Sequence, residues 1–248
     1  MKPYLRLLLL ICLAGLACNL PQSLNTPISG GAVEPEIIST APVLSDTPTQ
    51  QAVSTEIPPT LTPTIAPTAT PFGCLHPPDD YTRVAIYESI EISQRTLFML
   101  QHAQDLYGGP HDLVKAMTQG SYSTGVSASF GTHDGGGAVD ISVRDLGDWH
   151  HIVTEDFDAI ILALRQAGFA AWIRDTDELY AGSPIHIHAI AIGDAELSEA
   201  AARQLDGVEG YFRGFNGLPV DPPLPDGYGE PIICQWMLDI GYSDLRGE

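Results

Sequence analysis

The chain has 248 residues, of which 44% are hydrophobic, and its formal net charge is −20 at pH 7. This length and composition suffice for one globular domain of ordinary size, even if part of the chain is linker. The excess of carboxylates argues against nucleic acid and against an anionic membrane surface as partners, so most of them are expected to form a solvated acidic surface.

The first eighteen residues have the layout of an export signal. Lys2 and Arg6 precede an apolar run over residues 7–17, which is too short to span a bilayer, and Cys18 follows. The end of this run resembles a bacterial lipoprotein signal, in which the cysteine is lipidated and becomes the new amino terminus. We therefore predict an exported protein of the cell envelope, anchored through Cys18 outside the cytoplasmic membrane. Secretion and an uncleaved anchor stay open, since Gly15 stands where leucine is usual.

Residues 19–73 are rich in proline, threonine, serine, alanine and glutamine, and they contain no lysine or arginine. Such a segment buries too little apolar area to offset the entropy lost on ordering, which predicts a disordered stalk. A flexible chain of this length would hold the following domain about 40 Å from its anchor. That reach suits a protein that works in a cell wall.

The predicted domain covers residues 74–248, with a cysteine near each of its ends. Cys74 and Cys234 are the two cysteines outside the signal, and in an oxidising compartment they most simply pair. We therefore predict a disulfide between them.

Strands and helices interleave along this domain, and the stretches between strands are uneven. This order favours an α+β fold with a mainly antiparallel sheet and flanking helices. The pattern predicts a helix over residues 93–107, strands over 113–118 and 138–143, a helix over 156–168, strands over 169–175 and 184–193, and a helix over 196–205.

The stretch "HDGGGAVD" is the first of two motifs that carry chemistry. Three glycines allow the backbone to fold tightly after His133, which would bring its imidazole close to the carboxylate of Asp140. Asp140 alternates with apolar residues on its strand, so its side chain is expected on the face opposite the core.

The second motif is "HIHAIAI". His186 and His188 are two apart on a predicted strand and so share a face. Imidazole and carboxylate are ligands that zinc prefers, and a catalytic zinc site uses three of them plus an open position. Together with His133 and Asp140, the pair predicts a zinc site.

"HDGGGAVD" fits the His-x-x-Gly-x-Ala-x-Asp signature of zinc peptidases that include D-alanyl-D-alanine carboxypeptidases and dipeptidases, penicillin-insensitive murein endopeptidases and the Hedgehog amino-terminal domain. "HIHAIAI" is similar to the His-x-His strand of the endopeptidase and Hedgehog members. The resemblance covers residues 113–193. It implies that His133, Asp140 and His188 bind Zn²⁺ and that His186 acts catalytically beside the metal, by accepting a proton or stabilising an oxyanion. The implied reaction is hydrolysis of an amide in peptidoglycan or another peptide substrate.

The chain departs from that family at the general base. Ile185 occupies the place of the glutamate in the carboxypeptidase pattern Glu-x-x-His, and Gly182 occupies that of the Hedgehog glutamate. Asp177 and Glu178 are reserve candidates for a base.

The segment before the signature departs as well. It lacks the arginine of a Gly-Tyr-Arg sequence that can bind a terminal carboxylate, since Ser123 follows Tyr122, and Gly131 replaces a usual serine. Arg144 and Arg174 are alternative anion anchors, although a surface ion pair is the commoner role of such residues. Tyr122 would stack on substrate or pack its loop, and Trp172 is expected in the core. The remaining histidines are expected to be superficial or structural: His76, His102, His111, His150 and His151.

Three interpretations follow. The first is an envelope-tethered zinc hydrolase of peptide bonds, and the second is a zinc-containing binding module without catalysis, as the missing glutamate would allow. In the third, the glycines form a structural turn and no metal binds.

Overall fold

The computed structural model describes residues 72–87 and 89–248. The predicted signal, Cys18 and nearly all of the predicted stalk lie outside these residues. Within the described part, no helix is both long and apolar enough to cross a bilayer. In chain order the elements are β1 (Arg83–Tyr87), β2 (Ile90–Ser93), α1 (Gln94–Tyr107), β3 (Met117–Gln119), β4 (Ala138–Ser142), α2 (Phe157–Gln166), β5 (Phe169–Arg174), β6 (His186–Ala191), α3 (Glu199–Asp206) and α4 (Gln235–Asp239), with 3₁₀ turns between some of them.

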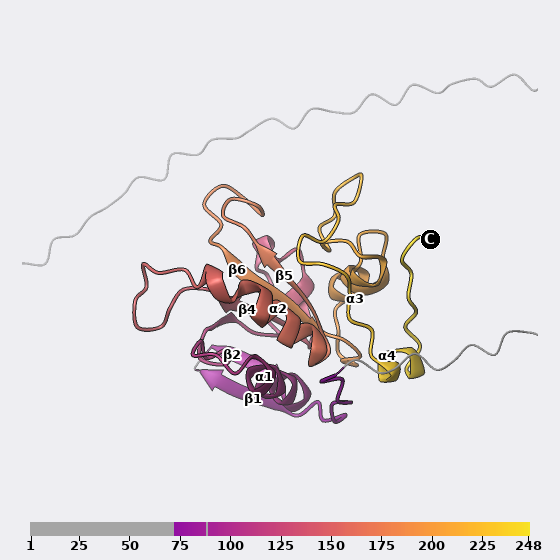
Figure 1. The fold of residues 1–248 in the computed structure, drawn as a ribbon, viewed down its shortest axis with the longest axis horizontal. Coiled ribbons are helices and arrows are strands. Elements are labelled where there is room, and N and C mark those ends of the chain that lie inside the picture. The colour runs from indigo at the N-terminus through magenta and orange to yellow at the C-terminus, as the bar shows by residue number, and fades with distance from the viewer. Residues whose placement is uncertain (1–71, 88) are drawn as a thin grey trace, which may run out of the picture. The chain divides into compact units, whose positions relative to one another are not determined.

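The predicted α+β fold is confirmed. Strands β3, β4, β6 and β5 form an antiparallel sheet in that order, and β1 pairs with β2 in a separate hairpin. Helices α1 and α2 pack against each other (Figure 1), while α3 and α4 belong to the part of the chain that follows the sheet.

Helix α1 begins and ends where the sequence predicts. The Ser93 hydroxyl accepts a hydrogen bond from the backbone N–H of Thr96, and Gly108 takes a left-handed conformation with φ of 64° at the other end. The hairpin just before this helix was not predicted, because its strands are short and half-exposed.

The predicted strand over residues 113–118 is wrong for most of its length, since only Met117–Gln119 forms β3. The side chain of Asp112 accepts a hydrogen bond from the backbone N–H of Lys115 at 2.9 Å, and its carbonyl accepts one from Ala116. These bonds fold the preceding residues into a turn. A short apolar run alone does not distinguish such a turn from a strand.

The four-stranded sheet has two different faces. On one face, alternate residues of β4, β5 and β6 pack against α1 and α2 in a continuous apolar core. On the other face, the register aligns three rows across β4, β6 and β5. The first row is Ala138, Ile190 and Ala170, the second is Asp140, His188 and Trp172, and the third is Ser142, His186 and Arg174.

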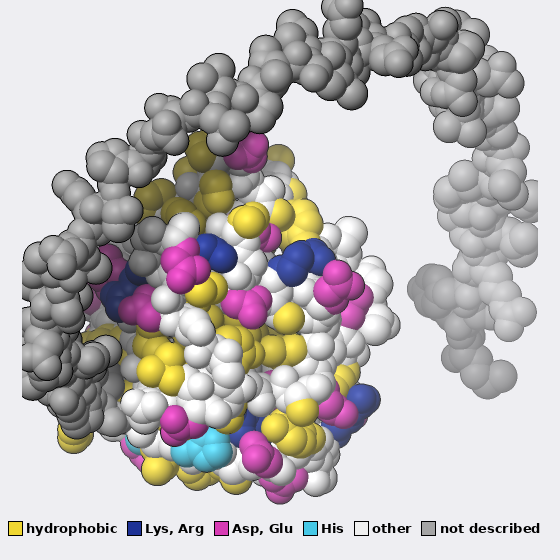
Figure 2. Space-filling view, turned by 90° about the vertical axis from the view of Figure 1, so that its right-hand side faces the viewer, with side chains coloured by type: hydrophobic (Ala, Val, Ile, Leu, Met, Phe, Trp, Pro, Cys, Tyr) yellow, Lys and Arg dark blue, Asp and Glu magenta, His cyan; other side chains and the backbone are white. Residues whose placement is uncertain are grey.

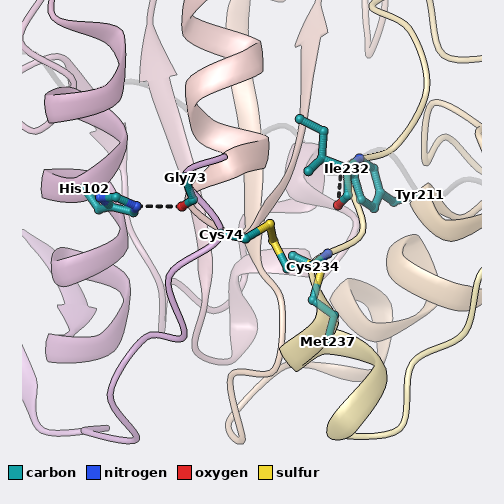
Figure 3. The surroundings of a disulfide bond; sticks show 7 residues. All are labelled: Gly73, Cys74, His102, Tyr211, Ile232, Cys234 and Met237. Atoms are coloured by element: carbon teal, nitrogen blue, oxygen red, sulfur yellow. Dashed lines mark hydrogen bonds between the residues drawn. A yellow bond between two sulfur atoms is a disulfide. The ribbon is translucent and has the colours of Figure 1, made fainter. Parts of the chain in front are cut away.

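The second face is covered in part by the chain that follows β6. The apolar row of this face, Ala138, Ile190 and Ala170, packs with residues of α3 and α4 in a second core. Tyr211 and Phe212 also belong to this core. The predicted disulfide lies here (Figure 3): Cys74 and Cys234 are bonded, with Cα atoms 5.5 Å apart and 160 residues between them in sequence. His102 of α1 donates a hydrogen bond to the Gly73 carbonyl beside it. The ends of the described domain are thus joined.

The face shown in Figure 2 bears acidic side chains spread among hydrophobic and uncharged ones, with a few basic groups between them. On this face the carboxylates do not gather into a single patch. Their dispersion agrees with the expectation of a solvated acidic surface.

Candidate metal centre

The loop that carries His133 is held by backbone hydrogen bonds. His133 lies in a 3₁₀ turn over Thr132–Asp134, and its carbonyl accepts a hydrogen bond from Ser123 N–H at 2.8 Å. Its ring Nδ1–H donates to the Gly120 carbonyl at 2.9 Å. The side chain is only 1% exposed, so both the loop and the ring are fixed.

The three glycines of the motif are required by a neighbouring segment as much as by the turn. A Cβ at Gly135 would lie 2.2 Å from the Glu196 carbonyl oxygen, and one at Gly136 would lie 2.7 Å from Asp194 Oδ1. Gly137 has φ of 78°, which side chains rarely adopt. Residues 194–198 therefore pack directly on the glycines, and a side chain at these positions would displace this segment from the His133 loop.

Asp140, His186 and His188 come from the polar rows of the two central strands. Asp140 of β4 is the register partner of His188 on β6. Its Oδ1 lies 2.8 Å from His188 Nδ1 and 3.2 Å from His133 Nε2. His186 is farther away, with Nε2 3.9 Å from Asp140 Oδ2.

These positions fit a metal ion. One ligand atom each from His133, Asp140 and His188 lie within 4.8 Å of one another. A tetrahedral zinc ion with ligands at 2.0–2.1 Å would hold its ligand atoms about 3.3 Å apart. The observed separations of 2.8 and 3.2 Å are close to this value. His186 is outside the cluster, next to it.

The outer nitrogens of the imidazoles are also held. Gly120 O accepts from His133 Nδ1–H, and Pro184 O accepts from His186 Nδ1–H at 2.8 Å. His188 Nε2 lies 3.1 Å from Gln204 Oε1. Such outer contacts orient the rings of metal-binding histidines. In His133 and His188 a proton on the outer nitrogen would leave the nitrogen that faces Asp140 able to bind a metal.

Burial and mutual charge set the protonation of the metal-free cluster. Burial acts to raise the pKa of Asp140, but hydrogen bonds from the two histidines outweigh it and hold that pKa well below its usual range. Burial lowers the pKa of His188 to about 4. Burial also opposes the charged form of His133, yet the contact with Asp140 leaves its pKa raised. The carboxylate is therefore ionised and His188 is neutral at pH 7, the forms in which each binds a metal, whereas a metal at His133 competes with a proton.

Two neighbouring hollows lie against the cluster and share part of their lining. A small one of about 20 Å³, large enough for one water-sized group, is lined by the three predicted ligands and by His186. A larger pocket of about 270 Å³ shares Asp140 and His186 with it. This larger pocket runs along the face of β4, from Asp140 past Ser142 to Arg144, and we call it the β4 pocket. Its other walls come from three loops, with Val126, Trp149, Leu179 and Tyr180 among their residues.

The two arginines proposed as anion anchors both lie near the cluster. Arg144 is half-buried at the far end of the β4 pocket, where its Nη1 donates to the Trp149 carbonyl at 3.0 Å. Arg174 is buried beside the small hollow and donates to the Asn216 carbonyl at 2.8 Å. Burial lowers the pKa of Arg174 to about 10, so it stays charged at pH 7. Neither forms an ion pair among the described residues.

Other residues singled out in the sequence lie elsewhere. Asp177 and Glu178 are exposed and bond to the backbone of their own turn, so neither lines the two hollows. Tyr122 packs its loop, with its hydroxyl 2.5 Å from Glu196 and the Arg83 guanidinium over its ring. Trp172 is in the core, as predicted, and stacks on His188.

The other five histidines lie outside the cluster. His111 is buried and donates to the Ser142 carbonyl, which makes it structural. His76 packs near Trp236, and His151 lies 3.3 Å from Glu155 on the surface. His102 bonds to Gly73, as described above. The side chain of His150 is exposed.

The sequence analysis did not identify Gln204 as part of the site. This residue lies sixteen positions after His188 in the chain. It lies on α3, whose amino-terminal Ser198 donates to the Thr132 carbonyl at 3.1 Å. The sequence offered one weak signal, because Gln204 is the single uncharged polar residue of α3 and its other residues are alanine, leucine or charged. Helix α3 thus contacts both the His133 loop and the His188 ring.

The chain matches no protein-family model, no curated protein and no solved structure. The site is therefore defined by the positions of its own residues: a group of His133, Asp140 and His188 that could hold a metal ion, with His186 beside it.

Proposed function

We propose that this protein is an exported, zinc-dependent hydrolase that cleaves amide bonds in peptidoglycan peptides. The observation that carries the proposal is the His133–Asp140–His188 cluster, with His186 beside it, at the inner end of the β4 pocket. Three protein ligands facing an accessible hollow are typical of catalytic zinc sites, whereas structural sites are closed by four.

Zinc in this site would act as a Lewis acid that polarises a carbonyl group and activates water for attack. In this proposal His186 moves the proton. Its Nδ1–H is bound by the Pro184 carbonyl, so Nε2 is available to take a proton from the attacking water and return it to the leaving amine. Arg174, charged and next to the small hollow, favours the negative charge that develops on the attacked carbonyl oxygen.

The β4 pocket would hold the peptide. Its side walls are largely apolar, with Val126 and Leu179 on different loops, while Arg144 places a cation at the end away from the cluster. A peptide that extends from the cluster along β4 would meet both kinds of surface. Stem peptides of peptidoglycan, which carry small apolar side chains and carboxylates, suit this combination.

The test is incubation of the zinc-loaded chain with muropeptides, followed by mass spectrometry of the products. We expect new peptide ends from the native chain, none after zinc is removed by a chelator, and at least a ~100-fold slower release from His186→Ala. That variant should retain zinc. His76→Ala, which changes a histidine far from the cluster, is the matched control and should cleave normally.

A zinc-containing binding module is the second candidate. It is favoured by one observation: among the described residues that line the two hollows, Asp140 is the only carboxylate, so no glutamate is present to act as base. A zinc-loaded native chain that binds muropeptides and leaves them intact over long incubation would establish the module and overturn the hydrolase.

The predicted export signal supports a location outside the cytoplasmic membrane, and we propose Cys18 as the lipid attachment site. Growth of an expressing bacterium with a labelled fatty acid tests the anchor. We expect label on the native chain and none on Cys18→Ser, which should be released from the membrane fraction. Equal labelling of both chains would contradict a lipid on Cys18.

A further inference from the structure

The partners of the three imidazoles differ in one respect. His133 and His186 each turn their outer nitrogen to a backbone carbonyl, which can only accept a hydrogen bond. The outer nitrogen of His188 faces Gln204, whose carboxamide can either accept through oxygen or donate through nitrogen. Only the ring of His188 therefore depends on a side chain for its tautomer.

This dependence concerns metal binding directly. A neutral imidazole carries one N–H, and His188 faces Asp140 through Nδ1. Binding a metal at Nδ1 requires a lone pair there and puts the proton on Nε2. The proton on Nε2 then needs an acceptor, and Gln204 Oε1 lies 3.1 Å away in the required place.

The opposite amide orientation would have the opposite effect. If the Gln204 NH₂ group faced His188, Nε2 would accept and the ring proton would move to Nδ1. It would then point at Asp140 Oδ1, 2.8 Å away, and occupy the direction in which the metal must bind. The orientation of one amide thus selects between a metal-binding cluster and a hydrogen-bonded one.

We propose that Gln204 is a positioning residue of the metal centre, which accepts the His188 Nε2 proton and thereby holds the tautomer that binds zinc through Nδ1. This inference rests on the proposed zinc site and adds a residue that the sequence motifs do not contain. Gln204 is 7% exposed, and α3 is fixed beside the cluster through Ser198, so the amide is held at this distance by the fold.

The test compares zinc dissociation constants by competition with a chromogenic chelator in the full chain. Gln204→Met keeps the volume and removes the acceptor, and we expect zinc affinity to fall by roughly 10–100-fold. Gln204→Glu can only accept when ionised, so its affinity should equal or exceed that of the native chain. Gln101→Met, at an exposed position of α1, is the matched control and should bind like the native chain.

A second measurement does not depend on variants. Nitrogen-15 NMR of the zinc-loaded native chain should show the His188 proton on Nε2, and a proton on Nδ1 would overturn the inference. Zinc affinity of Gln204→Met within about twofold of native, or Gln204→Glu as weak as Gln204→Met, would overturn it as well. In both cases the zinc site itself would stand. A native chain that binds no zinc overturns the site and the inference together.

Discussion

The two faces of the four-stranded sheet are built from the same strands but differ in composition and in what they contact. Toward α1 and α2, β4 presents Val139 and Ile141 and β6 presents Ile187, all of them fully buried in one apolar core. Toward α3, the same strands present Asp140 and His188. Neighbouring residues on one strand thus face different surroundings, one an apolar core and the other a cluster that could hold a metal ion.

The difference shows how a buried polar cluster is maintained in a small domain. The apolar face gains hydrophobic stabilisation that does not depend on a ligand. The other face places a carboxylate and three imidazoles in a site with little contact with water, which is costly unless each group is paired. A metal would complete this pairing. The part of the chain after β6, which covers this face, is held by hydrogen bonds and by the disulfide.

The largest effect on stability is expected from the disulfide, which joins Cys74 to the C-terminal part of the chain at Cys234. Replacing both cysteines, Cys74→Ser with Cys234→Ser, should lower the free energy of unfolding by about 5 kcal/mol in the chain-entropy estimate for so long a loop. Urea unfolding measures the loss. Amide exchange should accelerate more in α4 than in α1, since α4 directly follows Cys234. A loss below about 1 kcal/mol, or equal acceleration in both helices, would show that packing alone holds the C-terminal side.

Two adjacent residues of β4 separate the roles of the faces most directly. Ile141→Ala leaves a cavity in the apolar core and should cost about 3 kcal/mol of unfolding free energy. The folded variant should bind zinc like the native chain. Asp140→Ala should bind no zinc and so lose the roughly 2.7 kcal/mol that zinc at a hundredfold excess over its dissociation constant adds to the native chain.

Urea unfolding with and without zinc measures both variants. Each serves as the control for the other, because the two positions are neighbours on the same strand with opposite orientations. Zinc stabilising Asp140→Ala as much as the native chain would remove Asp140 from the ligand set. If Ile141→Ala changed the free energy of zinc binding by more than it changed the free energy of unfolding, the two faces would be coupled.

A smaller effect is expected where α3 meets the His133 loop. Ser198 caps α3 through the backbone N–H of Ala201 and donates to the Thr132 carbonyl. Ser198→Ala should cost about 1 kcal/mol in unfolding free energy, the usual price of a lost cap. Thermal unfolding compared with Ser243→Ala, at an exposed position, measures it. An unchanged midpoint of thermal unfolding would mean that the contacts of residues 194–198 with the glycines are enough to hold α3 in position.

The parts of the fold predicted from sequence are those with a strong local pattern. Strand β4 alternates apolar and polar residues, and α1 has a serine at its start and glycine after its end, so both were predictable. Within the site, the spacing of His186 and His188 was enough to place them on one face. The glycines after His133 indicated its grouping with Asp140, and the resemblance to a known family supplied the choice of His133, Asp140 and His188 as the ligands.

What the sequence did not predict depends on contacts between distant segments. Gly135 and Gly136 are glycines because residues 194–198 pack on them, which no local pattern records. Gln204 meets His188 only through the docking of α3, and hairpin β1–β2 is too short and half-exposed to give a periodic signal. Tertiary packing, rather than propensity, decides all of these features.

The strict alternation on β4 and β6 also protects the pairing of these strands. If β4 and β6 slipped by one residue, their two faces would be exchanged. Asp140 and His188 would then face α1 and α2, and Val139 and Ile141 would face the hollows. An ionised carboxylate cannot be accommodated among isoleucines and leucines without a partner. The same side chains that we assign to metal binding therefore exclude the slipped arrangement while the chain folds, before any ion is bound.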